Sequence, residues 1–182
     1  MTIEVNFYGT VIEGNDYFSN RLHERAWFGS AVQERPKALW AATQIIDTLN
    51  FKGFKSTVWT LLQNNGLTDY PVNVAMPTEA QLREANLAQA LEFPRGTDTE
   101  VPQDILIACY ELAHSLLDGK DPEMELENLG VVSQGYSSVR TSYNRSQVPI
   151  EHLINGVPNM YAWRLLRPFL RDGDAIKLSR VS

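Results

Sequence analysis

Apolar residues recur at helical spacing along the first fifty positions and predict two amphipathic helices. Between residues 17 and 28 apolar side chains return every fourth position, and Gly29 is a plausible stop. The preceding residues 13–16 form a turn-like sequence that could cap this helix. After Pro36, which suits the first position of a helix, a second stripe at positions i, i+4, i+7, i+8 and i+11 ends at Leu49.

The next segment interrupts this pattern before helical spacing returns. Glycine, asparagine and proline punctuate residues 54–77, which we interpret as an extended insertion with a short helix over 58–62. Thr78 and Gln81 have the spacing of a capping box. A helix is therefore expected from Thr78 to about Glu92, because a proline two residues further on disfavours helical geometry at the residue before it.

Three more helices are expected in the second half of the chain. Pro102 opens the cleanest apolar stripe, and Gly119 closes it. A short acidic helix follows over 121–128, and Pro158 opens a last helix that Pro168 kinks or ends. The stripe of the first of these helices consists of Ile105, Ala108, Cys109, Leu112 and Leu116.

The period changes from helical to two beyond Gly135, which predicts a strand. The pattern as a whole predicts a mainly α fold: a bundle of about four helices with a small β-hairpin or strand near 131–145 and an extended C-terminal arm. The length of 182 residues fits one domain. We divide it into a helical body over 1–145, with the insertion 54–77, and a basic arm over 146–182 that holds a short helix.

Charge is divided unevenly between these parts. Residues 1–134 carry 9 basic and 19 acidic side chains, whereas residues 135–182 carry 7 basic and 3 acidic ones. Such a split favours either a nucleic-acid patch or an arm that docks on an acidic surface. No apolar run has the length of a membrane span, and the start lacks the features of a secretory signal, so we expect a protein made in the cytosol with no membrane partner.

Few residues suggest catalysis or metal binding. Glu111 and His114 form one E-x-x-H, but a helical metal site needs a second such motif, so we expect a solvated or interfacial Glu-His pair. Cys109 lies on an apolar stripe and is expected in the core, where it could form no internal disulfide because it is the only cysteine. Phosphate-loop, nucleophile-elbow and zincin motifs do not occur. We therefore expect no enzyme, no cofactor and no metal.

Aromatic and basic residues alternate in the last quarter. Stacking aromatics and phosphate-binding arginines suit single-stranded nucleic acid, but the same residues are enriched at protein interfaces. The acidic body favours the protein interface, because it would repel phosphates beyond the arm. The candidate assembly residues are Arg140, Tyr143, Arg145, Trp163, Arg164, Arg167, Arg171 and Arg180.

Several short motifs, taken in order over about residues 10–145, resemble the head-to-tail adaptor proteins of tailed bacteriophages. Residues 38–47, followed by Phe-Lys-Gly at 51–53, resemble that family's pattern A-L-x-x-A-T-x-x-I-D … F-x-G. Residues 89–95 resemble its turn Q-x-L-x-[W/F]-P-R, and residues 101–113 resemble its next helix. The turn residues that match are Gln89, Leu91, Phe93, Pro94 and Arg95.

This resemblance implies a structural protein of the virion neck. Members of the family, which is often described as DnaT-like and single-stranded-DNA-binding, form a dodecameric ring beneath the portal. Such a ring extends the DNA channel, lets DNA pass and offers a platform to tail proteins. Residues 54–77 exceed the family's usual link. The alternative that the residues leave open is a single-strand-binding accessory protein of replication.

The turn residues also have a mechanical interpretation of their own. Pro94 fixes its own φ, and the preceding helix must end before it. Arg95 can leave the turn as a planar fork for a carboxylate or a backbone carbonyl. Residues 89–95 are therefore predicted to form a structural corner.

Overall fold

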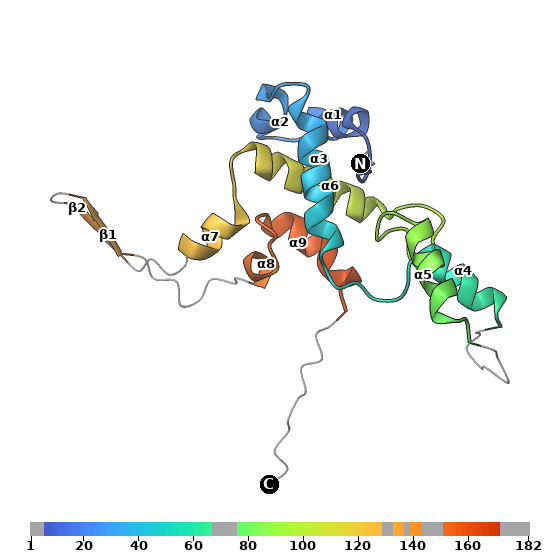
Figure 1. Cartoon of the computed structure of the whole chain (residues 1–182). Helices are drawn as coiled ribbons and strands as arrows, with labels where there is room; N and C mark the ends of the chain where they lie inside the picture. The colour runs from blue at the N-terminus through green and yellow to red at the C-terminus, as the bar shows by residue number, and fades with distance from the viewer. Residues whose placement is uncertain (1–5, 67–75, 129–132, 137–138, 143–150, 172–182) are drawn as a thin grey trace, which may run out of the picture.

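Helices dominate the computed structural model (Figure 1), which describes residues 6–66, 76–128, 133–136, 139–142 and 151–171. The predicted mainly α class is confirmed. Within the described ranges there are nine α-helices, several of them short, whereas the sequence predicted a bundle of about four. No helix in these ranges is long and apolar enough to cross a membrane.

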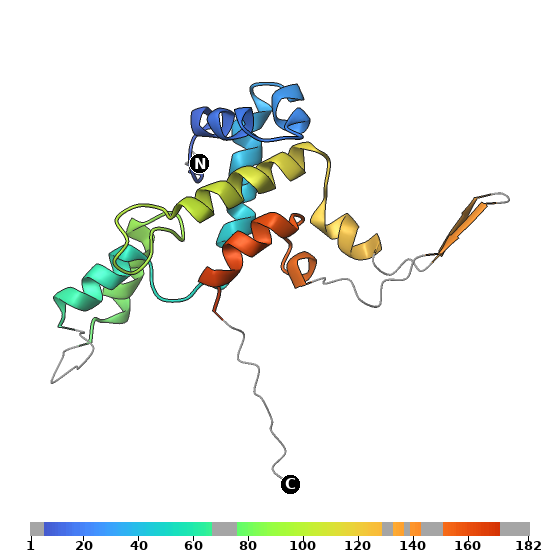
Figure 2. The same ribbon diagram turned by 180° about the vertical axis from the view of Figure 1, so that it is seen from behind.

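Three helices form the centre of the molecule: α3 (Glu34–Asp47), α6 (Gln103–Leu117) and α9 (Met160–Leu166). In both views α6 crosses α3, and α9 packs along α6 (Figures 1 and 2). The stripes predicted on α3 and α6 face this centre, where the core residues are largely inaccessible to solvent. Buried stripe residues include Ala38, Ala42, Ile46, Ile105, Ala108, Cys109 and Leu112.

The first helical segment differs from the single helix predicted over 17–28. It consists of α1 (Val11–Ser19) and α2 (Arg25–Gly29). Between them His23 has a φ of 64°, a left-handed conformation that a continuous helix does not contain. The prediction of one helix was wrong because apolar spacing does not reveal such a break.

Helix α1 also begins earlier than predicted. The Thr10 hydroxyl accepts a hydrogen bond of 3.1 Å from the backbone N–H of Glu13 and so caps the helix. Residues 13–16, predicted as a turn, therefore lie inside α1. Phe18 and Trp27 are fully buried, with ring centroids 4.8 Å apart, and attach the two short helices to the core.

The predicted insertion over 54–77 begins with a helix that is longer than expected. α4 spans Ser56–Asn64, whereas the sequence predicted a helix over 58–62. It packs against α5 (Glu79–Ala88), and the pair projects from one side of the molecule (Figures 1 and 2). The described first part of the insertion thus forms one of two packed helices, and residues 67–75 lie outside the described residues.

The capping box predicted for α5 is confirmed. The Thr78 hydroxyl accepts a hydrogen bond from the backbone N–H of Gln81, and the Gln81 side chain accepts one from the backbone N–H of Thr78. The helix ends at Ala88 rather than near Glu92. The next residue, Gln89, has an extended backbone with φ −115° and ψ 109°, and its carbonyl accepts a bond from Lys55 Nζ at 3.1 Å.

Short elements follow α6, which ends before Gly119 as predicted. The acidic helix α7 spans Pro122–Asn128, and α8 spans Glu151–Ile154. Strands β1 (Ser133–Tyr136) and β2 (Val139–Ser142) pair antiparallel, with Ser133 opposite Ser142. The predicted strand near 131–145 falls partly outside the described residues and stays a prediction.

The described chain ends beside the loop that follows α3. The predicted end of the last helix at Pro168 is confirmed, since α9 passes into the short 3-10 helix η1 (Arg167–Phe169). Phe51 and Leu170 form an isolated antiparallel bridge, and the backbone N–H of Lys52 donates to the carbonyl of Phe169 at 2.9 Å. The C-terminal segment therefore closes onto the body through backbone hydrogen bonds.

Candidate functional site

The corner predicted at residues 89–95 is built around the Gln89 carboxamide. Its Nε2 donates to the carbonyls of Leu91 at 2.9 Å and Pro94 at 2.8 Å. Its Oε1 accepts a bond of 3.4 Å from the backbone N–H of Thr57 in α4. The bond between Phe93 and Pro94 is cis. One side chain thus holds both ends of the turn and the adjacent helix α4.

Arg95 acts as the fork that the sequence predicted. Its guanidinium donates to the carbonyls of Lys52 at 2.9 Å and Gly53 at 2.7 Å, and to the Glu92 carboxylate at 2.5 Å. The guanidinium carbon also lies 5.7 Å from the centroid of the Phe51 ring. Arg95 therefore joins the corner to the loop after α3, which confirms the structural interpretation.

Phe93 anchors the corner in the core. It is buried, and its ring meets those of Tyr8, Phe51 and Phe169 edge to face, with centroids 4.7 to 6.2 Å apart. Its backbone N–H donates to the Tyr8 hydroxyl oxygen at 3.2 Å. Leu91, another matching residue, is half-buried against the same core.

Asp47, the last residue of α3, connects that helix to the corner. Its carboxylate accepts a short hydrogen bond from the Tyr8 hydroxyl and one of 3.4 Å from the backbone N–H of Glu92. Burial raises the pKa of the Asp47 carboxyl, although these two bonds oppose that change. Burial, with the nearby Asp47 charge, also raises the pKa of Tyr8. The group is a structural junction held by polar contacts.

Two sequence motifs that lie about forty residues apart therefore meet in space. Asp47 of the first motif touches Glu92 in the second, and Arg95 of the second binds Gly53, the last residue of the first. Thr43, within the first motif, accepts a bond of 3.0 Å from the backbone N–H of Tyr8. The residues on which the resemblance rests thus support one another in a single corner.

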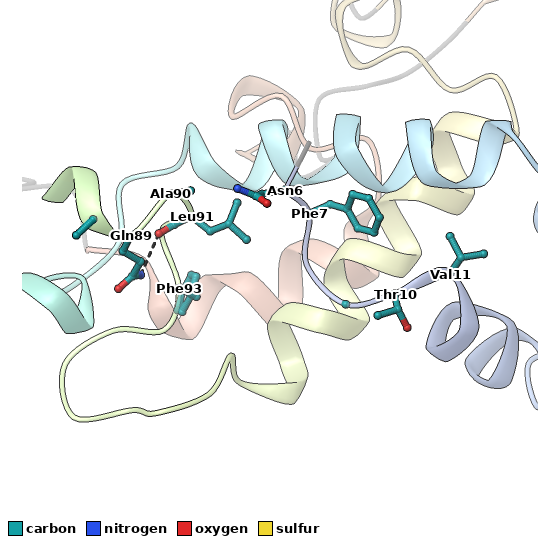
Figure 3. Close-up of a pocket in the computed structure, with 10 residues that line it drawn as sticks. Asn6, Phe7, Thr10, Val11, Gln89, Ala90, Leu91 and Phe93 are labelled. Carbon is teal, nitrogen blue, oxygen red and sulfur yellow. Dashed lines mark hydrogen bonds between the residues drawn. The ribbon is translucent and has the colours of Figure 1, made fainter. Parts of the chain in front are cut away.

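A cavity of about 560 Å³ lies beside the corner (Figure 3). One wall is the N-terminal segment 6–11, and the other is the turn 88–93. Its lining is mainly apolar and includes no acidic or basic side chain, and the Thr10 hydroxyl already bonds to Glu13. Nothing in this lining resembles an acid–base pair or an activated nucleophile.

The arm predicted over 146–182 is described only over 151–171, where α9 packs into the core instead of extending from the body. Arg164, Arg167 and Arg171 are exposed on and just after α9. Arg140 belongs to β2, without a described side chain, and Tyr143, Arg145 and Arg180 lie outside the described residues. The structure therefore brings three of the predicted assembly residues to the surface of one short segment.

Trp163 contradicts its predicted place in this interface. It is 5% exposed and belongs to the hydrophobic core. On α9 the residues Ala162, Trp163 and Leu166 are buried where the helix packs on α6, whereas Arg164 and the following Arg167 are exposed. An aromatic residue next to an arginine was interpreted as part of one surface, although neighbours on a helix point in different directions.

The prediction for Glu111 was also wrong. It was expected in a solvated or interfacial pair with His114, but its side chain is fully buried and binds other groups. It accepts bonds of 2.7 Å from the Tyr17 hydroxyl and from Arg21, and it lies 3.4 Å from Asn159 Nδ2. Three segments of the chain thus meet at one carboxylate.

His114 makes a different contact from the one predicted. Its Nε2 lies 3.0 Å from the carbonyl oxygen of His23, and its ring stacks on Phe18 with centroids 5.3 Å apart. Burial and the neighbouring Arg21 lower the pKa of His114. The sequence carried one signal of burial at Glu111, since the helix over 105–117 is apolar on most sides.

Cys109 lies in the core, as predicted. It is fully buried, and burial raises the pKa of its thiol to about 12. Its sulfur lies 3.5 Å from the Thr43 hydroxyl and 3.6 Å from the carbonyl of Leu39. Across the part of the chain that the structure describes, no group of three or more His, Cys, Asp or Glu side chains could hold a metal ion.

Comparisons with known proteins add no further guide to the site. Neither a family model, nor a curated protein, nor a solved structure matches the chain.

Proposed function

We propose that this chain is a structural protein of a bacteriophage neck, a head-to-tail adaptor that forms a twelve-membered ring beneath the portal. The ring would extend the DNA channel and give tail proteins a platform. DNA passes through it, and no catalytic step or cofactor is involved. The protein would be made in the host cytoplasm and act in the virion.

The observation that carries this proposal is the corner. The two motifs that resemble the adaptor family are distant in sequence, yet Asp47, Glu92, Arg95 and Gly53 bring them together. Motif residues that build one shared structure are more informative than isolated matches, because their spacing depends on a common fold. The mainly α fold agrees with the same family.

The exposed arginines on and after α9 would form the surface that contacts a neighbouring copy or the portal. Arg164, Arg167 and Arg171 carry no hydrogen bond or ion pair from their side chains among the described contacts, so their charges face outward. The chain before residue 135 is acidic overall. A neighbouring acidic body or the portal would therefore complement this cationic surface.

The test mixes the purified chain with the portal protein encoded by the same genome and measures the mass of the complex. We expect a portal complex that holds about twelve copies, as in the family it resembles. Arg164→Glu with Arg167→Glu should weaken this binding at least about tenfold, because two attractive contacts become repulsive. Melting of the isolated variant should stay nearly unchanged, since exposed charges contribute little to folding.

A matched control changes the same charges elsewhere. Arg25→Glu with Lys37→Glu reverses two exposed cations on α2 and the first turn of α3, and should leave portal binding intact. A chain that stays monomeric and ignores the portal would contradict the proposal. Tight, salt-sensitive binding of oligonucleotides by that monomer would instead support the replication accessory protein.

A further inference from the structure

The projecting helix α5 has an outer face with no partner among the described residues. None of its ten residues is buried. Leu87 is 71% exposed, and Arg83 and Glu84 have no hydrogen bond or ion pair among the described contacts. A shallow hollow of about 700 Å³ follows this face beside Ala80, Arg83, Glu84 and Leu87.

Helical geometry places these four residues on one stripe. Their spacing of i, i+3, i+4 and i+7 is that of a seam between two packed helices. The two half-buried residues Leu82 and Ala85 lie on the opposite side of the helix, where α5 packs against α4. The stripe therefore points away from the protein's own body.

The stripe is complementary to itself when two copies run antiparallel. With a two-fold axis between positions 83 and 84, Arg83 of one copy lies opposite Glu84 of the other, and the reverse pair forms as well. On the same axis Ala80 lies opposite Leu87, so a small side chain meets a large one at both ends. The order small, positive, negative, large thus gives two opposite charge pairs and two apolar contacts.

We propose that α5 is a self-association surface, through which two copies of this chain form an antiparallel, two-fold dimer. The partner is a second copy because both the charges and the side-chain sizes match under that symmetry. A contact of one ten-residue helix is smaller than a standard interface, so the dimer is weak, with a Kd of about 10 to 100 µM.

This dimer does not depend on the adaptor function. A two-fold contact closes on itself and cannot propagate around a cyclic ring, so the pairing concerns copies outside the ring. The dimer could exist in a protein with no portal partner, and a ring could form without the dimer. Its test therefore needs only the isolated chain.

Sedimentation equilibrium over about 5 to 500 µM, a range that brackets this Kd, measures the association of the full chain. Arg83→Glu places two like-charged pairs at the axis and should weaken the dimer at least about tenfold. Glu84→Arg should do the same. An equimolar mixture of these two variants should restore association as a heterodimer, because both central positions are acidic in one copy and basic in the other.

A control variant on the same helix separates the stripe from general charge effects. Asn86→Glu changes an exposed residue that lies off the stripe, and it should leave the dimer within about twofold of wild type. A wild-type chain that is monomeric throughout the concentration range would overturn the proposal. So would a dimer that Arg83→Glu leaves intact, or a mixture of the two reversals that fails to associate.

Discussion

A single buried carboxylate, Glu111, joins three separate parts of the chain. Tyr17 and Arg21 come from α1 and the loop after it, and Asn159 caps α9 through its own side chain. Arg21 remains 29% exposed, whereas Glu111 has no exposure. The carboxylate of this ion pair is therefore held inside the protein, whereas the Arg21 guanidinium remains in contact with water.

Replacing Glu111 with Gln should lower the free energy of unfolding by about 2 kcal/mol, because the amide keeps the shape of the side chain but leaves the Arg21 charge without its counter-ion. The loss is smaller than for a fully buried pair because water still reaches Arg21. Denaturant unfolding of E111Q measures this loss of free energy of unfolding. The control is Glu123→Gln, which changes an exposed side chain in the same way. Equal stabilities of the two variants would contradict the role of Glu111.

At the scale of elements, two helical glycines have opposite surroundings. Gly14 in α1 faces Trp27, and a Cβ at this position would lie 2.8 Å from Trp27 Cζ2. Gly29, at the end of α2, has open space where its Cβ would be. The close approach of α1 to the buried indole therefore depends on Gly14 alone.

Alanine substitutions should separate these positions. Gly14→Ala should destabilise the protein by about 1 to 3 kcal/mol, because the rigid Trp27 ring cannot move away from the added methyl group in a filled core. Gly29→Ala should be neutral or stabilise by up to about 1 kcal/mol, since alanine favours helix. Thermal unfolding of both variants measures these changes in stability. A Gly14→Ala protein as stable as Gly29→Ala would disprove the close contact.

Local sequence pattern predicted where the main helices lie but not where every helix breaks or ends. α3 and α6 were predicted because their apolar stripes are long and regular, and the capping box identified the start of α5. The break at His23 and the early end at Ala88 were not predictable. Each lies beside a contact with a distant residue: the His23 carbonyl lies 3.0 Å from His114 Nε2, and the Gln89 carbonyl accepts a bond from Lys55 Nζ.

Across the whole molecule, two histidines make stability depend on pH. Burial lowers the pKa of His114 and of His152 from the ordinary value of 6.5. Below that value the unfolded chain takes up protons that the folded chain does not bind, so stability falls as the pH decreases. Asp47 acts in the opposite sense, because its raised pKa costs stability as the pH rises above 3.8.

We therefore expect the free energy of unfolding to fall between about pH 7 and pH 5.5. His114→Gln should flatten this part of the curve, because glutamine does not titrate, and its amide can still donate to the carbonyl of His23. Urea unfolding at several pH values compares the two proteins. Parallel curves would rule out a contribution from His114.

The candidate site was predictable only in its local part. Arg95 was correctly expected to bind carbonyls or a carboxylate, because its planar guanidinium offers several donors that fit such acceptors. The predictions for Trp163 and Glu111 were wrong, since both required knowledge of which helix face meets α6 or α9. The chemical type of one residue does not show which way its helix face points in the folded protein.

The order of residues along the chain was enough to predict the helical class, the central stripes, the buried cysteine and the corner at residues 89–95. These follow from periodicity, hydrophobicity and backbone restriction, which act over a few residues. Only the folded chain reveals that Asp47 meets Glu92, that Glu111 is buried against Arg21, and that α5 turns the stripe from Ala80 to Leu87 outward. Such contacts join residues far apart in the chain, and only the packing of whole helices fixes them.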